Sequence, residues 1–146
     1  MGKVLYGEYQ HSLDPKGRLS LPAKFRAELG ERVVISRGLE KCLFVVSVKE
    51  FEALVERLKG LPLGRREARD FTRFLLAGSA DAEVDSHGRI LIPQSLREYA
   101  GLEREVVLIG VATRVEIWDR RAYEAFSERA EDEFEANAEK LMDRGV

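Results

Sequence analysis

The chain of 146 residues contains the same segment twice, at an offset of 71 residues. Residues 14–26 read DPKGRLSLPAKFR, and residues 85–97 read DSHGRILIPQSLR. The aspartate, the glycine, both arginines and the proline recur identically, and the apolar positions match in kind. Each copy is followed by a β-branched apolar run, at 33–35 and at 106–108. A repeated supersecondary unit restricts the chain to folds that are built from two similar halves.

Each copy has the pattern of a strand, a tight turn, a second strand and a short helix. Tyr9–Leu13 alternates as a half-buried strand does. Asp14–Gly17 predicts a turn, because the aspartate can accept backbone amides and the glycine permits positive φ. Leu19–Leu21 alternates again, and Pro22 and Gly30 are placed to begin and end a helix. Further strands are predicted from the β-branched runs at Val33–Ile35 and Leu43–Val46.

Three longer helices are expected after the repeated strands. Ser47–Glu50 is a capping box, and it opens a helix with an apolar face made of Phe51, Leu54, Val55 and Leu58. A second helix is expected at Arg65–Ala77, burying Phe71, Phe74 and Leu75. Asp119 can cap the last helix. The apolar face of this last helix consists of Tyr123, Phe126, Ala130, Phe134, Ala138 and Leu141.

A unit of about fifty residues buries too little surface to be stable alone without a disulfide or metal. We therefore expect the two units to pack together as pseudo-symmetric halves of one barrel. The predicted fold class is α+β with a mainly β core and peripheral helices. The predicted organisation is a first repeat at 7–54, an inter-repeat helix at 55–77, a second repeat at 78–121 and a C-terminal acidic helix at 122–146.

Charge is distributed unevenly along the chain. The net charge is −2, but residues 1–60 carry +3, residues 61–76 carry +2 and residues 77–146 carry −7. A uniformly basic protein is excluded. Within residues 14–26, four cations (Lys16, Arg18, Lys24 and Arg26) accompany the single acid Asp14. Such a local patch is what an anionic partner requires, because affinity for phosphates depends on the facing surface rather than on total charge.

The sequence argues against an enzyme, a metal site and a cofactor site. Its one cysteine, Cys42, permits no internal disulfide and is expected to be buried. Its two histidines, His11 and His87, lack the spacing of metal ligands, and no nucleotide-binding glycine motif is present. Asp85, Ser86 and His87 are the residue types of a hydrolase triad, but neighbours in one turn rarely share a proton path. Without a membrane segment or signal peptide, a cytoplasmic protein is expected.

The repeated string D-x-x-G-R-apolar-x-apolar-P resembles the AbrB/SpoVT motif. Two tandem copies, covering the chain from Gly7 to about Phe126, resemble the MraZ family in particular. This resemblance implies swapped-hairpin β-barrel halves and rings of several subunits. It also implies binding to short direct repeats of DNA upstream of the division and cell-wall gene cluster that begins with the protein's own gene, usually as a repressor. Double-stranded DNA and further copies of the chain are thus the expected partners, at the nucleoid.

The D-x-x-x-R pattern of the family falls on Asp14 with Arg18 and on Asp85 with Arg89. The DNA-binding residues are expected to be Arg18, Lys16, Lys24 and Arg26, with Arg89 as a lesser contact. The residues that shape the two turns are expected to be Asp14, Gly17, Asp85 and Gly88. The second turn has Ser86 and His87 in place of Pro15 and Lys16, so equal contact by both halves is not expected.

Two other interpretations remain open. The D-x-K-G-R turn is often purely structural, with the arginine paired to the aspartate; both roles are compatible if Asp14 orients Arg18. The chain is alternatively a ring-forming protein-interaction module whose DNA binding is incidental. That alternative draws on the acidic helix Tyr123–Asp143 and on the apolar segment Phe71–Leu75, while Trp118 suits either the core or a subunit interface.

Overall fold

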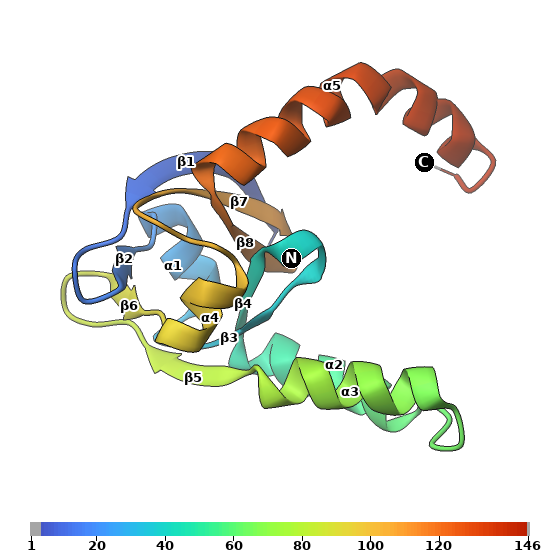
Figure 1. Cartoon of the computed structure of the whole chain (residues 1–146), viewed down its shortest axis with the longest axis horizontal. Helices are drawn as coiled ribbons and strands as arrows, with labels where there is room; N and C mark the ends of the chain where they lie inside the picture. The colour runs from blue at the N-terminus through green and yellow to red at the C-terminus, as the bar shows by residue number, and fades with distance from the viewer. Residues whose placement is uncertain (1–3, 146) are drawn as a thin grey trace.

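The computed structural model describes residues 4–145, in which the two units contain the same strands and α-helices in the same order (Figure 1). The first unit comprises β1 (Leu5–Ser12), β2 (Arg18–Ser20), α1 (Ala23–Leu29), β3 (Arg32–Arg37), the 3-10 turn η1 (Leu39–Lys41), β4 (Leu43–Ser47) and α2 (Val48–Lys59). The second unit comprises β5 (Ala80–Glu83), β6 (Arg89–Leu91), α4 (Gln94–Tyr99), β7 (Glu105–Ala112), β8 (Arg114–Asp119) and α5 (Arg120–Met142). Helix α3 (Arg66–Ala77) joins the units and has no counterpart.

The predicted helix starts are confirmed. Pro22 and Pro93 immediately precede α1 and α4. The Ser47 hydroxyl accepts a hydrogen bond from the Glu50 amide at 3.1 Å, at the start of α2. The Asp119 carboxylate accepts one from the Arg121 amide at 3.2 Å, at the start of α5. These side chains satisfy amides that have no partner within the helix.

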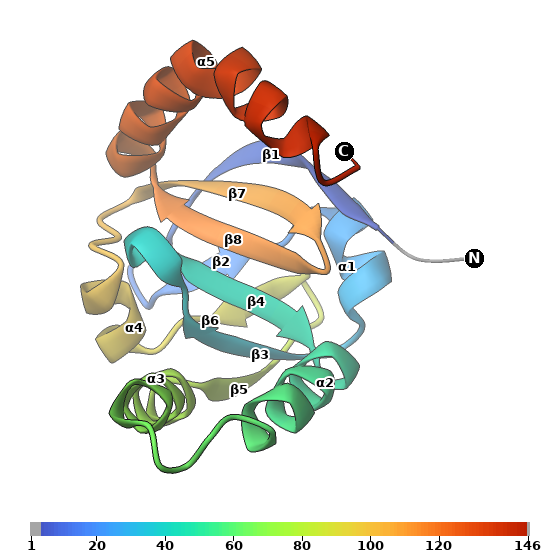
Figure 2. The ribbon, with the colours of Figure 1, turned by 90° about the vertical axis from the view of Figure 1, so that its right-hand side faces the viewer.

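The strands of the two units interleave in a single antiparallel sheet. The strand order is β1-β7-β8-β4-β3-β5, so β1 of the first unit pairs with β7 of the second, and β5 pairs with β3. At the centre of the sheet, β4 of the first unit pairs with β8 of the second (Figure 2). Strands β2 and β6 form a separate two-stranded ribbon, again across the units. The first strand of each unit therefore pairs with a strand of the other unit.

The predicted class, α+β with a mainly β core, is confirmed, and the main sheet is antiparallel. Across residues 4–145 the strands do not close into a barrel, because β1 and β5 remain the two edges of an open six-stranded sheet. The expected pair of barrel halves is replaced by one sheet to which both units contribute. No helix of the described chain is long and apolar enough to cross a membrane.

One core serves both units. Equivalent apolar residues of the repeat are all buried in it, in the pairs Leu19 with Ile90, Leu21 with Ile92 and Phe25 with Leu96. The Tyr9 ring meets the Phe25 ring edge-on, with centroids 5.1 Å apart. Cys42 is buried as expected. Because the core combines residues from both copies, neither half possesses a hydrophobic interior of its own.

Two predicted apolar faces are only partly buried. In α3, Leu75 is buried, but Phe71 and Phe74 are 46% and 54% exposed, so the expectation that they are buried is wrong. The Arg37 guanidinium instead lies over the Phe74 ring, with its Cζ 3.8 Å from the ring centre. Arg37 Nη1 also donates to the Phe74 carbonyl at 2.7 Å. In α5, Phe134 is 72% exposed, because the helix leaves the sheet after its first turns (Figure 1).

Candidate nucleic-acid interface

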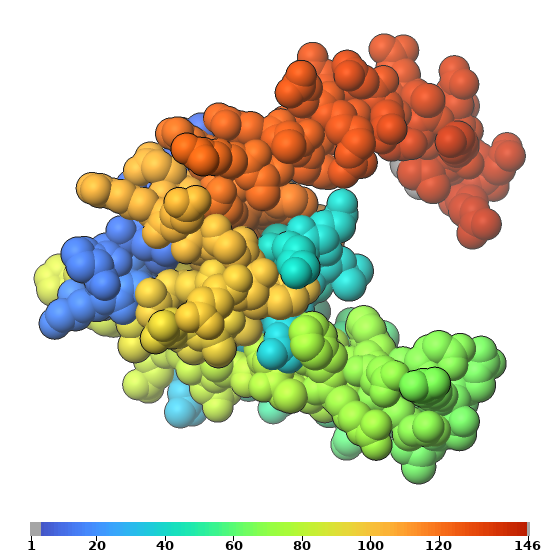
Figure 3. All heavy atoms as spheres, viewed as in Figure 1, coloured from blue at the N-terminus to red at the C-terminus, as the bar shows by residue number. Residues whose placement is uncertain are grey.

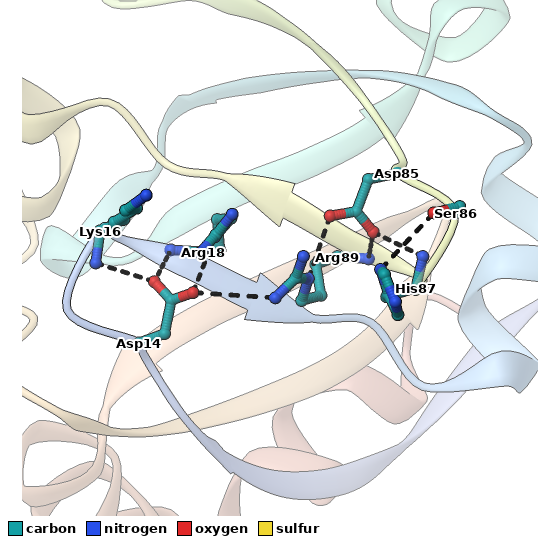
Figure 4. Close-up of polar contacts among 7 residues, drawn as sticks. All are labelled: Asp14, Lys16, Arg18, Asp85, Ser86, His87 and Arg89. Carbon is teal, nitrogen blue, oxygen red and sulfur yellow. Dashed lines mark hydrogen bonds and ion pairs between the residues drawn. The ribbon is translucent and has the colours of Figure 1, made fainter.

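The two turns of the repeat lie at opposite ends of one short ribbon, because β2 pairs with β6 in antiparallel register (Figure 4). In each turn the glycine amide donates to the aspartate carbonyl, Gly17 to Asp14 and Gly88 to Asp85, both at 2.9 Å. The ribbon is also tied to the turns, since the Gly88 carbonyl accepts from the Leu21 amide at 2.9 Å. The Gly17 carbonyl accepts likewise from the Ile92 amide. The sequence predicted two separate turns, and the fold joins them into one surface.

The first turn is organised around the carboxylate of Asp14. Its Oδ1 accepts the backbone amides of Lys16 at 2.9 Å and Arg18 at 2.8 Å, and its Oδ2 accepts Arg18 Nε at 2.7 Å. The backbone hydrogen bond from Arg18 is the main reason that the pKa of Asp14 is lowered to about 2. Asp14 is therefore ionised at neutral pH and fixes the direction of the Arg18 side chain.

The second turn repeats this geometry with Asp85. Its carboxylate accepts the amides of His87 at 2.8 Å and Arg89 at 2.9 Å, and Arg89 Nε at 3.0 Å. The backbone hydrogen bond from Arg89 is the main cause of a lowered pKa of Asp85. Arg89 Nη1 also lies 3.9 Å from Asp14 Oδ2, so Asp14 faces the arginines of both repeats.

Arg18 and Arg89 are the predicted site residues that the fold brings together. Their side chains are 34% and 30% exposed, so each guanidinium is held by a carboxylate yet remains accessible from solvent. A guanidinium held in this way suits bidentate recognition of a phosphate or of the O6 and N7 atoms of guanine. Lys16 is exposed in the first turn, whereas its equivalent in the second turn is His87.

Lys24 and Arg26 take part in contacts outside the first turn. Lys24 Nζ lies 3.3 Å from the centre of the Tyr6 ring on β1, which is a cation–π contact. Arg26 Nε donates to the Leu21 carbonyl at 3.1 Å, and its guanidinium covers Gly88, where a Cβ would lie 2.8 Å from it. Arg26 thus supports the turn of the second repeat.

Arg97 plays the same part for the first turn, and it was not among the residues predicted from the sequence. Its Nε donates to the Ile92 carbonyl at 2.9 Å, and its guanidinium covers Gly17, where a Cβ would lie 2.7 Å from it. The signal was present, since Arg26 and Arg97 are equivalent in the repeat. Each repeat therefore braces the turn of the other with its second arginine.

The side chains of Asp85, Ser86 and His87 make contacts within the second turn and do not form a catalytic triad. The Asp85 carboxylate bonds to the backbone amides of His87 and Arg89 and to the Arg89 side chain. Ser86 Oγ lies 3.5 Å from His87 Nδ1, at the outer limit of a hydrogen bond. Across residues 4–145, no group of three or more His, Cys, Asp or Glu side chains is arranged to hold a metal ion.

Comparison with known proteins gives a consistent result over the chain. The sequence model of a family described as "MraZ protein, putative antitoxin-like" matches twice, at residues 4–74 and 75–145. A protein of Thermoanaerobacter sp. (strain X514), named "Transcriptional regulator MraZ", is 50% identical over 143 residues, covering 98% of this chain and 100% of the relative. A protein of the same name from Caldicellulosiruptor bescii is 58% identical over 115 residues, covering 79% of this chain and 80% of the relative. The two halves defined by the repeat thus each match one copy of the family model.

Proposed function

Since this chain belongs to the MraZ family, we propose that it is a transcriptional regulator that binds specific double-stranded DNA through its paired turns. The observation that carries the proposal is the pair of guanidinium groups, Arg18 and Arg89, which lie on one face of the β2–β6 ribbon and both contact Asp14. Oriented arginines on a rigid ribbon are suited to contact base edges and phosphates together. The name shared by the relatives supports a regulatory role.

In this proposal the first turn makes the main DNA contacts. Arg18 reads base edges, Lys16 contacts phosphate, and Lys24 adds positive charge from α1, where it lies against Tyr6. Arg26 combines its bracing of the second turn with a lesser contact to DNA. Arg89 contributes less than Arg18, because its turn carries His87 in place of a lysine and lies close to Asp81 and Glu83. The target would be short direct repeats upstream of the protein's own gene, in the division and cell-wall cluster, which it represses at the nucleoid.

The proposal includes self-assembly and gives no role to catalysis. Each copy offers one small basic surface, so several copies in a closed ring would engage successive DNA repeats with high avidity. The exchange of β1 and β5 between the units corresponds, in this proposal, to the swapped-hairpin arrangement of the family. The proposed domains are a first repeat at 7–54, an inter-repeat helical segment at 55–77, a second repeat at 78–121 and a C-terminal acidic helix at 122–146. The partners are DNA and further copies of the chain.

A titration by fluorescence anisotropy tests DNA binding. The native fragment upstream of the gene and a scrambled duplex are compared at two salt concentrations, with wild type, Arg18→Ala and the control Arg66→Ala on α3. We expect salt-sensitive binding to the native fragment alone. Losing one bidentate base contact costs about 1–3 kcal/mol, so Arg18→Ala should weaken binding by about 5- to 150-fold while Arg66→Ala leaves it unchanged.

The opposite result would favour the second candidate function. The exposed apolar residues of α3 and α5 support a protein-interaction module. Folded wild-type protein that ignores both duplexes, or that binds them equally, would contradict sequence-specific DNA recognition. An Arg18→Ala variant that binds the native fragment as tightly as wild type would leave DNA binding intact but would refute the assigned contact.

A further inference from the structure

Two apolar surfaces on this chain are uncovered, and they project from the same side of the sheet. One is the helical hairpin, which consists of α2, α3 and the connecting residues 60–65; the other is the distal segment of α5, residues 131–142. In the ribbon and space-filling views they form two arms with a hollow between them (Figures 1 and 3). We propose that the distal segment of one copy docks in the groove of the helical hairpin of a second copy. The inference rests on the self-assembly in the proposed function and not on its DNA binding.

The helical hairpin contains a groove of about 490 Å³ with an apolar floor. Val55 and Leu58 of α2, Leu61 and Leu63 of the connection and Leu76 of α3 contribute to it. Leu63 is 81% exposed, although removing a side chain of this kind from water is favourable. Exposed apolar side chains gathered in one concave site are typical of an interaction surface.

The charged residues that line the groove are all cations: Lys59, Arg69 and Arg73. Their present contacts are local and solvent-exposed. Lys59 Nζ lies 2.8 Å from Glu56, Arg73 Nη1 lies 3.8 Å from Asp70, and Arg69 Nη1 donates to the Leu63 carbonyl at 3.0 Å. Exposed pairs of this kind contribute little to stability, so the cations remain available to an incoming acidic surface. The groove therefore fits an amphipathic helix that carries acids beside its apolar residues.

The distal segment of α5 is such a helix. Phe134, Ala138 and Leu141 follow the i, i+4, i+7 spacing of one helical face. The acids Glu131, Glu135 and Glu139 follow at i, i+4, i+8 along the adjacent row. Every residue from 131 to 145 is exposed in the single chain. Three acids beside an apolar row match three cations beside an apolar floor.

The lengths of the two surfaces also agree. At 1.5 Å per residue, the distal segment of twelve residues is about 18 Å long, and so are α2 and α3. Docking a helix of this kind into a groove is a common mode of recognition. Because the groove and the distal segment are different surfaces, the contact is heterologous, and repeating it from copy to copy produces a closed ring or an open filament.

The distal segment is held away from the groove of its own chain. The first turns of α5 are packed on the sheet, where the Trp118 ring lies 5.1 Å from Phe126 and the Tyr123 hydroxyl donates to Glu8 at 2.8 Å. Arg129 on α5 pairs with Glu40 at 3.6 Å. These contacts direct the helix outward, along the arm opposite to the helical hairpin (Figure 3). A second copy is therefore the occupant that the geometry favours.

Charge reversal tests the contact, with mass measured by analytical ultracentrifugation over a range of concentrations. The groove variant carries Arg69→Glu and Arg73→Glu, and the helix variant carries Glu131→Arg and Glu135→Arg. We expect each to weaken self-association by at least tenfold, and all four changes in one chain to restore it. The matched control, Asp132→Arg with Asp143→Arg, makes the same change of charge on the side of α5 opposite Phe134 and should assemble as wild type does.

Disulfide trapping identifies the occupant directly. Chains with Thr72→Cys in the groove are mixed with chains with Ala138→Cys on the helix; the native Cys42 is buried and should not interfere. We expect a disulfide-linked heterodimer from the mixture and none when Asp132→Cys replaces Ala138→Cys. A disulfide within one chain carrying both cysteines at high dilution would show that the chain fills its own groove, and would overturn the proposal.

The remaining outcomes separate this inference from the proposed function. If wild type assembles and none of the charge variants changes its mass, the interface is wrong and self-assembly stands. If wild type is a monomer at micromolar concentration, both self-assembly and this interface are refuted. DNA binding in the anisotropy titration is judged independently of either result.

Discussion

At the residue scale, the most consequential side chain is Asp14. It accepts two backbone amides and one guanidinium nitrogen from its own turn, and it faces Arg89 of the other repeat. Its carboxylate therefore shapes the turn, orients Arg18 and links the two repeats. The structural and DNA-binding interpretations of the turn are compatible for this reason, because the carboxylate holds a guanidinium that stays partly exposed.

The charge on Asp14 makes a pH-dependent contribution to stability. Its pKa is lowered from 3.8 to about 2, mainly by the backbone hydrogen bond from Arg18. A group with a lowered pKa in the folded state stabilises it fully above the unfolded pKa, and this contribution is lost as pH falls from about 4 to about 2. We expect Asp14→Asn to be less stable than wild type at pH 6. The difference in stability between the two proteins should become smaller as the pH falls through this window.

Urea unfolding midpoints of the two proteins at pH 6, 4, 3 and 2 provide the measurement. The substituted amide side chain keeps one oxygen for the backbone amides but loses the ion pair and the hydrogen bond from Arg18 Nε. The change of the stability difference with pH, rather than its size at pH 6, therefore reports the charge. The Asp85→Asn variant should behave in the same direction, because the pKa of Asp85 is lowered by the equivalent hydrogen bond from Arg89. A difference that stays constant down to pH 2 would contradict this account.

The residues of the turns were predictable, but their neighbours across the repeat were not. Aspartate and glycine at fixed positions define a turn through local hydrogen bonds, so residues 14–17 and 85–88 could be identified from sequence. The contact of Arg89 with Asp14, and the bracing of Gly17 by Arg97, depend on the pairing of β2 with β6. No local pattern specifies that pairing.

At the scale of elements, the sequence predicts where helices begin, but it does not predict which of their apolar faces are buried. Pro22, Ser47 and Asp119 mark the starts of α1, α2 and α5 through backbone chemistry within a few residues. An apolar stripe identifies the face of a helix that avoids water, but it does not show that another element covers that face. Phe74 contacts Arg37 and Tyr99 but stays half exposed, and Phe134 is largely exposed, which only the tertiary arrangement reveals.

The turn that joins β1 to β2 supplies a test at this scale. Gly17 has φ of +87°, and a Cβ there would lie 2.7 Å from the Arg97 side chain. Gly17→Ala should therefore destabilise the protein by about 1–2 kcal/mol for the left-handed backbone, and by more where Arg97 cannot move aside. Chemical denaturation of the purified variant gives the free energy of unfolding.

Gly60→Ala is the matched control. Gly60 ends α2 with φ of −81°, and a Cβ there would meet the Arg57 carbonyl at an ordinary 3.5 Å. The same substitution should leave stability unchanged or raise it by about 0.4–1 kcal/mol, because alanine restricts the unfolded chain. Equal effects at Gly17 and Gly60 would show that the first turn is not conformationally constrained.

For the whole molecule, the repeat predicted two similar halves but not the way they share strands. A sequence pattern shows which residues alternate as a strand, but it does not identify the strand that pairs with them. The pairing of β1 with β7 and of β5 with β3 makes each half incomplete without the other. The shared sheet explains how two units of about fifty residues are stable without a disulfide.

A shared sheet should unfold as one cooperative unit, and two probes in different halves can show this. Trp118 is buried in the second half, and its fluorescence reports unfolding there. Cys42 is buried in the first half, and its burial raises the pKa of the thiol to about 12, so the folded protein should resist labelling by a thiol reagent at pH 8. Urea should expose both residues at one midpoint.

The Gly17→Ala variant makes this comparison stricter. The substitution lies in the first half, so independent halves would lower the midpoint for Cys42 labelling and leave the Trp118 midpoint where it is in wild type. Interleaved halves should lower both midpoints equally, because β1 cannot leave the sheet without uncovering β7, and β7 pairs with the strand that carries Trp118. Separate midpoints, in wild type or in the variant, would refute the single cooperative unit that the strand exchange requires.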